Sequence, residues 1–358
     1  MPPLITDLVA TLHTAPLVRP WGEAVREMHV IEVVVRCDDG SSGTGFSWTP
    51  TIGPKAVVAL LRHDIRDFVI GRPAEAAPLW DDLWHHLHEA GSGGLTTIAM
   101  AGVDLALWDR DASQRGLPLV DHLGRRHDSA PVYGSGVNLH YSLDELVAQA
   151  ERWVAAGCTG VKVKVGKPEL GEDVDRIAAV RDVLGPDRHL MIDANQRWDL
   201  TTARRAVAAL ERFDLDWIEE PLLADETAAF AELRRSIDVP VALGENCHTI
   251  YRFRDLIDAG AVDVVQPNIV RVGGITPFLA IAELARTHSL EVAPHLLPEL
   301  SGQLALTLPG RSWVEDVEDA SFDRLGLLSE PTGVTIADGL LRVGGGSPGL
   351  GLHFTADT

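Results

Sequence analysis

The sequence predicts an α/β fold, a (β/α)7β barrel of the TIM type with an α+β capping domain formed by the N-terminal region and the C-terminal tail. From Pro131 onward, short apolar runs alternate with amphipathic segments of helical length. Three of these runs end in an acid, at Asp193, Glu219 and Glu245, which are 26 and 26 residues apart, about one strand-plus-helix unit each. Carboxylates at the carboxyl ends of successive parallel strands are how such a barrel builds a metal site.

The composition restricts the possible partners. The chain has 358 residues, of which 46% are hydrophobic, and a formal net charge of −21. The hydrophobic fraction suffices for a large core. The negative charge argues against nucleic acid or an anionic membrane as a partner. We therefore expect a small-molecule partner, and an anionic one would need positive charge concentrated at its site.

Cysteine usage and the N-terminal residues indicate a cytoplasmic protein. The three cysteines show no CxxC spacing, which suits a reducing compartment better than a disulfide framework. The first residues lack the basic region of a signal peptide and include Asp7. No apolar run approaches the roughly 20 residues that a membrane-spanning helix needs, so we expect no membrane association.

The predicted capping domain, residues 1–125, begins with a three-stranded meander. Strands are expected at 4–13 and 29–36, and a hairpin turn followed by a returning strand is expected at 37–48. The Pro- and Gly-containing stretch 15–27 is expected to be a loop. Helices are expected at 53–70, 75–90 and 95–114. The Gly- and Pro-rich tail, residues 325–358, cannot form a core alone, so we expect it to fold back on the N-terminal unit.

The predicted barrel, residues 126–324, consists of seven clear βα units and a weaker eighth. Its strands are expected to end near Gly134, Lys164, Asp193, Glu220, Gly244, Pro267, Pro294 and Glu315. Helices are expected near 142–156, 172–184, 201–212, 226–237, 250–259, 275–287 and 299–307, with Thr201 as an N-cap. A doubly wound sheet is the alternative, but residues 134–140 lack the glycine spacing that its first turn needs.

The three strand-tip acids predict a magnesium site. Three oxygen ligands without histidine or cysteine favour magnesium over zinc. Alternatively, Asp193, Glu219 and Glu245 could pair with neighbouring groups and serve only the fold. Burying three like charges together is unfavourable without a cation, however, and this favours the metal site.

Four further residues are expected at the same end of the barrel. Alternation places Lys162 and Lys164 on one side of their strand, where they could neutralise the acids, or bind a carboxylate and remove a proton. His295 ends the seventh strand and Glu315 the eighth. His295 could instead be a satisfied core histidine, and Glu315 an ordinary exposed acid.

The strand-tip motifs together resemble the enolase superfamily, specifically its mandelate racemase subgroup. The motifs are KVK, MIDANQ, WIEEP, GEN, VQPNIVRVGGIT and APHLLPE, in this order along the chain. The resemblance implies Mg²⁺-assisted removal of the proton alpha to a carboxylate, giving an enediolate. It also implies a homo-oligomer.

The resemblance implies a role for each matching residue. Asp193, Glu219 and Glu245 would bind magnesium. Lys162 would hold the substrate carboxylate, and Lys164 and His295 would be the acid/base groups on opposite sides of the substrate. Glu315 would hydrogen-bond the developing enediolate, and Asn195 would touch the metal-bound end of the substrate.

The chain departs from the family pattern at Asn268, where an aspartate usually pairs with the strand-seven histidine. An asparagine can orient an imidazole but cannot stabilise an imidazolium by charge. We therefore expect Lys164 to be the base and His295 to be an acid or a positioning group. Racemisation needs competent bases on both faces of the substrate, so the departure argues against a racemase.

Substrate specificity is expected to come from two loops of the cap, at residues 15–25 and 47–53. Arg19, Trp21 and Trp48 are candidates for substrate contact, and His140 of the barrel is another. The tryptophans could instead pack the seam between the two domains.

The sequence therefore favours a magnesium-dependent lyase that dehydrates a sugar acid. A racemase or epimerase of a 2-hydroxy acid is the first alternative. A metal-dependent hydrolase would place an HxH motif at a strand tip, and none of the expected tips carries one. A barrel that binds metal without turnover, as a binding protein, is the alternative from another class.

Overall fold

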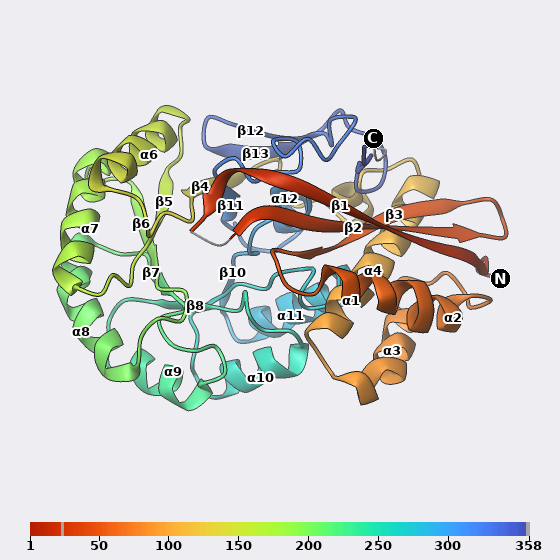
Figure 1. The fold of residues 1–358 in the computed structure, drawn as a ribbon, viewed down its shortest axis with the longest axis horizontal. Coiled ribbons are helices and arrows are strands. Elements are labelled where there is room, and N and C mark those ends of the chain that lie inside the picture. Colours follow the sequence, from red (N-terminus) through yellow and green to blue (C-terminus); the bar gives the residue numbers. More distant parts are fainter. Residues whose placement is uncertain (23–24, 356–358) are drawn as a thin grey trace.

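A computed structural model describes residues 1–22 and 25–355. It consists of a barrel of parallel strands with helices outside, and an antiparallel sheet with its own helices beside one end of the barrel (Figure 1). The predicted barrel with an α+β cap is confirmed. Residues 23–24, within the predicted loop 15–27, and residues 356–358, at the end of the predicted tail segment, lie outside the described residues.

The cap sheet contains β1 (Ile5–Trp21), β2 (Val25–Cys37) and β3 (Ser42–Thr49), antiparallel in the order β1-β2-β3. The predicted loop at 15–27 is wrong for most of its length, because β1 continues through Trp21 and pairs with β2. The prolines in this stretch suggested a break. They are tolerated because β1 is an edge strand with one side unpaired, and the register shifts between Pro16 and Trp21.

The cap helices pack on this sheet and on one another. They are α1 (Pro54–Leu60), the π-helical turn Leu61–Ile65, α2 (Arg66–Val69), α3 (Ala76–Leu87), the 3-10 turn His88–Ala90, α4 (Leu95–Gln114) and α5 (Leu119–Leu123). Two glycines of β3 allow α4 to approach: a Cβ at Gly43 would lie 2.0 Å from the carbonyl oxygen of Ala106, and one at Gly45 would lie 2.3 Å from that of Gly102. Only glycine fits at these two positions.

The barrel strands run parallel in the order β10-β9-β8-β7-β6-β5-β4, and β11 pairs with β4. This pairing brings the last barrel strand next to the first, so the sheet curves into a barrel. The strands are β4 (Ala130–Ser135), β5 (Gly160–Lys164), β6 (His189–Asp193), β7 (Trp217–Glu219), β8 (Val241–Leu243), β9 (Val264–Val265), β10 (Glu291–Val292) and β11 (Val314–Val317).

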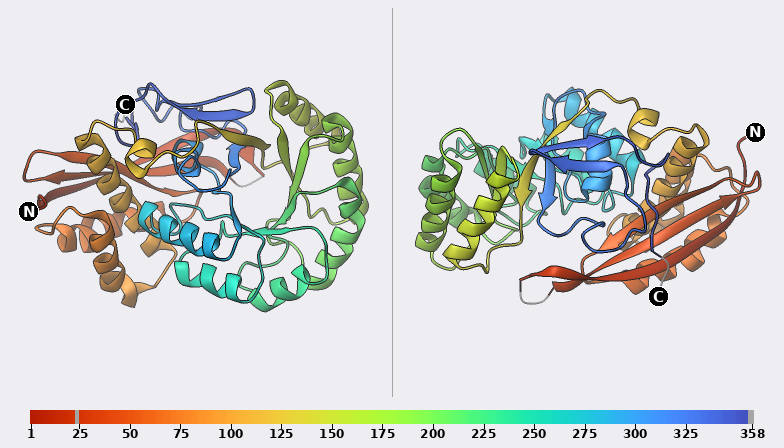
Figure 2. Two further views of the ribbon diagram at one scale, coloured as in Figure 1. Left: turned by 180° about the vertical axis from the view of Figure 1, so that it is seen from behind. Right: turned by 90° about the horizontal axis from the view of Figure 1, so that it is seen from above.

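Helices follow the strands and lie outside them (Figure 2). They are α6 (Leu143–Ala155), α7 (Leu170–Leu184), α8 (Leu200–Leu210) with the 3-10 turn Glu211–Phe213, α9 (Thr227–Arg234), α10 (Ile250–Asp258), α11 (Ile275–Thr287) and α12 (Pro298–Ala305). The N-cap of α8 is Asp199, which accepts a hydrogen bond from Thr202 N at 2.7 Å, so the predicted cap at Thr201 is wrong. An aspartate and a threonine are both good caps, and the sequence alone did not distinguish them.

The C-terminal tail contacts both units. The hairpin of β12 (Val334–Ala337) and β13 (Leu340–Val343) adds to the barrel, where β13 pairs antiparallel with β4. The chain then returns to the cap, where Leu350 N donates to Asp109 Oδ1 at 2.7 Å and Phe354 stacks on His13. The tail therefore ties the barrel to the cap.

A buried acid joins the cap to the barrel directly. Asp104 of α4 accepts hydrogen bonds from Thr276 N (3.0 Å) and Thr276 Oγ1 (2.5 Å) at the start of α11. Gly274 allows this approach, since a Cβ there would lie 2.2 Å from Asp104 Oδ2. Burial raises the pKa of Asp104 to about 7, although the hydrogen bonds from Thr276 lower it in part.

Among the described residues, no helix is long and apolar enough to cross a lipid bilayer.

The Asp104 contact predicts a measurable pH dependence of stability. The folded-state pKa of about 7 lies above the ordinary value of 3.8, so the folded protein holds a proton that the unfolded chain has lost. This contribution to stability should decline as the pH rises from about 4 to about 7, by an amount on the order of 4 kcal/mol. Asp104→Asn, which does not titrate, should lack this decline. Urea unfolding of both proteins between about pH 4 and 8 measures the difference.

Asp67→Asn, an exposed acid of α2, serves as the matched control and should follow the wild type. A difference between wild type and Asp104→Asn that stays constant with pH would contradict the assignment.

Candidate metal centre and active site

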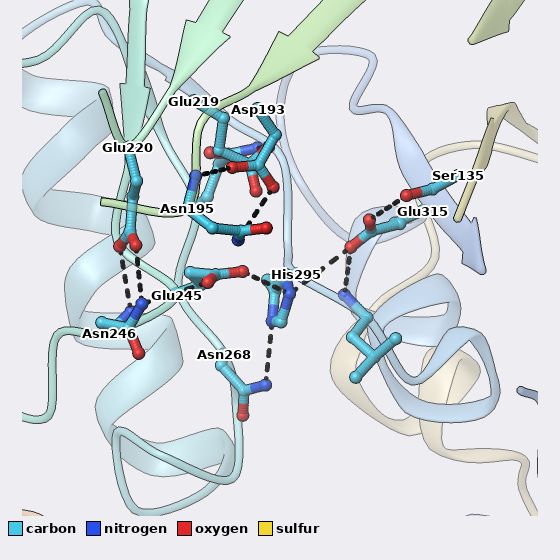
Figure 3. Close-up of polar contacts among 12 residues, drawn as sticks. Ser135, Asp193, Asn195, Glu219, Glu220, Glu245, Asn246, Asn268, His295 and Glu315 are labelled. Atoms are coloured by element: carbon cyan, nitrogen blue, oxygen red, sulfur yellow. Dashed lines mark hydrogen bonds and ion pairs between the residues drawn. The ribbon is translucent and has the colours of Figure 1, made fainter. Parts of the chain in front are cut away.

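Three carboxylates meet at the carboxyl ends of neighbouring barrel strands. Asp193 ends β6 and Glu219 ends β7, where the two residues pair in register, and Glu245 follows β8. One oxygen from each of the three lies within 4.8 Å of the others. Figure 3 shows the three side chains turned toward one another. Asp193 and Glu219 are fully buried, and Glu245 is 8% exposed.

This donor set fits a hard divalent cation. It offers carboxylate oxygens alone, which suits magnesium, calcium or manganese rather than zinc. Burial raises the pKa of Glu219 to about 7, and the neighbouring Asp193 adds to this while Lys162 opposes it. Crowding three acids in a dry site is therefore unfavourable unless positive charge is supplied there.

Two lysines of β5 supply part of that charge. Lys162 donates to both oxygens of Glu219 at 2.8 Å and forms an ion pair with Glu315 Oε1, also at 2.8 Å. Lys164 contacts Asp193 Oδ2. Both amines are buried and both lie on the acid side of the strand, as alternation along a strand requires.

Glu315, which shares Lys162 with Glu219, is held by three partners. Its Oε1 accepts a hydrogen bond from Ser135 Oγ at 2.7 Å, in addition to the Lys162 ion pair, and its Oε2 accepts one from Leu296 N at 3.1 Å. Burial alone would raise the pKa of Glu315, but Lys162, His295 and Lys164 hold it at about 2. Glu315 is therefore an ionised hydrogen-bond acceptor in this arrangement.

His295 lies between two of the acids. Its Nε2 is 2.7 Å from Glu245 Oε2 and 3.7 Å from Glu315 Oε2. Its Nδ1 is 3.0 Å from Asn268 Nδ2 (Figure 3). The two residues after His295, Leu296 and Leu297, both adopt left-handed backbone with φ of 57° and 55°. Such conformations are rare for leucine, and they concentrate at functional sites.

Asn195 supports one of the acids. Its backbone N donates to Asp193 Oδ1 at 2.7 Å and its Nδ2 to Asp193 Oδ2 at 3.2 Å. Its φ of 43° is also left-handed, a conformation that asparagine tolerates better than most residues. The structure thus places Asn195 beside Asp193, whose orientation it fixes.

The predicted specificity residues are not all brought to one place. Arg19 and His140 line a cavity of about 340 Å³ between the end of β1 and α6, and the lining of this cavity includes none of the three acids. Arg19 pairs with Asp319 at 2.9 Å. Trp48 is 2% exposed and Trp21 packs against the core, so both tryptophans contribute to packing.

Trp48 still has a connection to the centre. The guanidinium of Arg271 lies over its ring, 5.9 Å from the ring centroid. Arg271 also donates to the carbonyl oxygen of Glu245 at 2.9 Å. The cap tryptophan and the third acid therefore share one arginine.

The sequence reasoning missed a layer of residues around the acids. Gln266 Nε2 donates to Glu219 Oε2 at 2.8 Å, and Asn246 Nδ2 donates to both Glu220 (2.6 Å) and Glu245 (3.0 Å). Each lies within two residues of a strand-tip residue that the sequence did identify. That proximity along the chain was the available signal, because a polar residue beside a buried acid needs a partner.

Comparison with protein-family models gives two matches. Residues 6–124 match the mandelate racemase / muconate lactonizing enzyme, N-terminal domain, and residues 145–358 match the enolase C-terminal domain-like family.

Curated relatives and solved structures extend this similarity. The chain is 38% identical over 294 residues to the L-talarate/galactarate dehydratase of Salmonella typhimurium, covering 82% of this chain and 74% of the relative. It is 36% identical over 313 residues to the 3,6-anhydro-alpha-L-galactonate cycloisomerase of Streptomyces coelicolor, covering 87% and 86%. A crystal structure of L-talarate dehydratase from Polaromonas sp. JS666, complexed with Mg and L-glucarate, superposes with a TM-score of 0.89 at 37% identity, covering 98% of this chain and 95% of that one.

The geometry of the centre predicts how metal affinity responds to substitution. Glu219→Gln should weaken magnesium binding by at least about 100-fold, because even residues that only orient a ligand change affinity by 10–100-fold. Calorimetric titration with magnesium measures the affinity, and the rise in melting temperature with added magnesium provides a second readout.

The matched control is Glu299→Gln, another buried barrel acid, which accepts from Phe322 N at 2.6 Å and lies outside the group of three. It should bind magnesium as the wild type does. Equal losses in the two variants would contradict a site built from the three strand-tip acids.

Proposed function

Because this chain belongs to the mandelate racemase/muconate lactonizing enzyme family of the enolase superfamily, we propose that it is a magnesium-dependent dehydratase of a sugar acid. The observation that carries the proposal is the convergence of Asp193, Glu219 and Glu245, with the Lys164 amine against Asp193 and the His295 imidazole against Glu245. The names of the relatives support the substrate class.

Asp193, Glu219 and Glu245 would hold the magnesium ion. When bound, the ion supplies Lewis-acid stabilisation of negative charge that develops on a carboxylate. The Lys162 amine contacts both Glu219 of this group and Glu315, at 2.8 Å each. We assign the amine of Lys162 to the substrate carboxylate, where a fixed positive charge favours the enediolate over the ground state.

Lys164 would be the base. The substrate loses the proton alpha to its carboxylate to the Lys164 amine, and the electron pair left behind forms the carbon–carbon double bond as the beta hydroxyl departs. That hydroxyl takes up the proton that Lys164 removed and leaves as water, which returns the amine to its neutral form, and the remaining enol tautomerises to a 2-keto acid. The sum is a hydroxy acid converted to a 2-keto acid and water.

Isomerisation is the second candidate. A relative that is 36% identical is named a cycloisomerase, and another at 33% identity is named D-galactarolactone cycloisomerase. Cycloisomerisation, like the racemase or epimerase alternative, leaves the mass of the substrate unchanged, whereas dehydration removes one water. A binding protein without turnover would bind magnesium and exchange no alpha proton.

We also propose that the protein acts in the cytoplasm as a homo-oligomer. The three cysteines are free and buried, as suits a reducing compartment. Light scattering of the purified protein tests the oligomer.

The test of function is a sugar-acid library assayed for keto-acid formation with magnesium. We include galactarate, L-talarate and L-glucarate, which the names of the relatives suggest. We expect keto acid from at least one member. Lys164→Ala should lower kcat by roughly 10³-fold, since general acid–base groups contribute about 10²–10⁴-fold.

Lys167→Ala is the matched control, because Lys167 lies three residues further along and pairs with Glu172 on the surface of α7. It should retain activity within about 2-fold. A product with the same mass as the substrate would show that the enzyme is an isomerase and not a dehydratase. Alpha-proton exchange that survives in Lys164→Ala would overturn the assignment of the base.

A further inference from the structure

The Asn268 carboxamide has its orientation fixed by the backbone around it. The side chain is fully buried just after β9, and its Oδ1 accepts hydrogen bonds from Val270 N at 3.1 Å and Arg271 N at 3.0 Å. The opposite orientation would point the NH₂ group at two N–H donors and leave both without an acceptor. Buried donors without acceptors are strongly disfavoured. The oxygen therefore faces the loop, and the nitrogen faces away from it.

The nitrogen end of Asn268 faces His295. Asn268 Nδ2 is 3.0 Å from His295 Nδ1. An amide nitrogen only donates, so Nδ1 must be the acceptor in this hydrogen bond. In a neutral imidazole one nitrogen accepts and the other carries the hydrogen. The hydrogen of His295 is thereby placed on Nε2.

The contacts of Nε2 agree with this placement. Nε2 is 2.7 Å from Glu245 Oε2 and 3.7 Å from Glu315 Oε2, and both groups are hydrogen-bond acceptors. Glu245 is one of the acids that would hold the metal ion, so these two contacts do not carry the placement of the hydrogen. The placement rests on the Asn268 amide, which donates to Nδ1.

We propose that Asn268 is a positioning residue that fixes His295 as the Nε2–H tautomer, so that the imidazole donates a hydrogen bond into the site and does not accept a proton from the substrate. The inference rests on the proposed function only for its catalytic consequence. An aspartate at this position would do the reverse: with one oxygen on the two backbone N–H groups, its other oxygen would accept from Nδ1–H and leave an Nε2 lone pair facing the site.

The consequence for catalysis is a site with one base. Lys164 is then the group that removes the alpha proton, and His295 stabilises negative charge or the departing hydroxyl by donating a hydrogen bond. A neutral imidazole that acts as a donor is a known catalytic arrangement. With one base, dehydration proceeds, and inversion at the alpha carbon lacks its second proton acceptor.

The direct test is nitrogen NMR of the magnesium-loaded protein labelled with ¹⁵N in histidine. The signals of His295 among the 14 histidines are assigned by their loss in His295→Gln. We expect a protonated, pyrrole-type Nε2 and an unprotonated, pyridine-type Nδ1. Asn268→Asp should move the hydrogen to Nδ1. A wild-type His295 that carries its hydrogen on Nδ1, or on both nitrogens, would overturn the proposal, whether or not the variant folds.

Exchange of the substrate alpha proton in D₂O provides the catalytic test. Lys164→Ala should lower exchange by roughly 10³-fold, and the double variant Lys164→Ala/Asn268→Asp should exchange at least about 10-fold faster than Lys164→Ala. Absence of that gain would contradict a role of the tautomer in limiting proton transfer. If no library acid exchanges in the wild type, the proposed function fails, while the tautomer is still decided by the NMR spectrum.

Discussion

The constraint that shapes this site is the repulsion among three carboxylates placed together in a buried strand-tip layer. Parallel pairing in register puts Asp193 and Glu219 side by side, and Glu245 follows from the next strand. Like charges at such distances in a dry interior cannot all be ionised without compensation. Lys162 and Lys164 provide part of it from the adjacent strand. The cationic groups that these acids gather, the two lysine amines and a magnesium ion, would stabilise a dianionic enediolate.

Much of the barrel and of its central residues could be predicted from the sequence. Both follow from regular patterns over short stretches of the chain: strands alternate with helices, and side chains alternate between the two sides of a strand. The alternation of strand and helix predicted the fold, and alternation within one strand put Lys162 and Lys164 on one side. The error at residues 15–27 has a different origin. Prolines such as Pro16 and Pro20 would break a strand in the middle of a sheet. The sequence did not show that β1 lies at the edge of its sheet, where they are tolerated.

Contacts between segments far apart in the chain could not be predicted in the same way. Asp104 and Thr276 are 172 residues apart, and nothing local to either indicates the other. Ser135 and Glu315 meet because β4 and β11 are the first and last barrel strands. The orientation of the Asn268 side chain is a further case, because it depends on two backbone N–H groups and on a ring 27 residues away. The departure at this position was visible in the sequence, but the direction of its hydrogen bonds was not.

The most direct test of the central claim is anomalous diffraction from crystals grown with manganese, which shares with magnesium the preference for oxygen ligands. We expect one strong peak among the strand tips, coordinated by Asp193, Glu219 and Glu245, with the Lys164 amine moved away from Asp193. A peak elsewhere, or an ion bound by fewer than two of these three acids, would contradict the claim that the strand-tip carboxylates form a single metal centre.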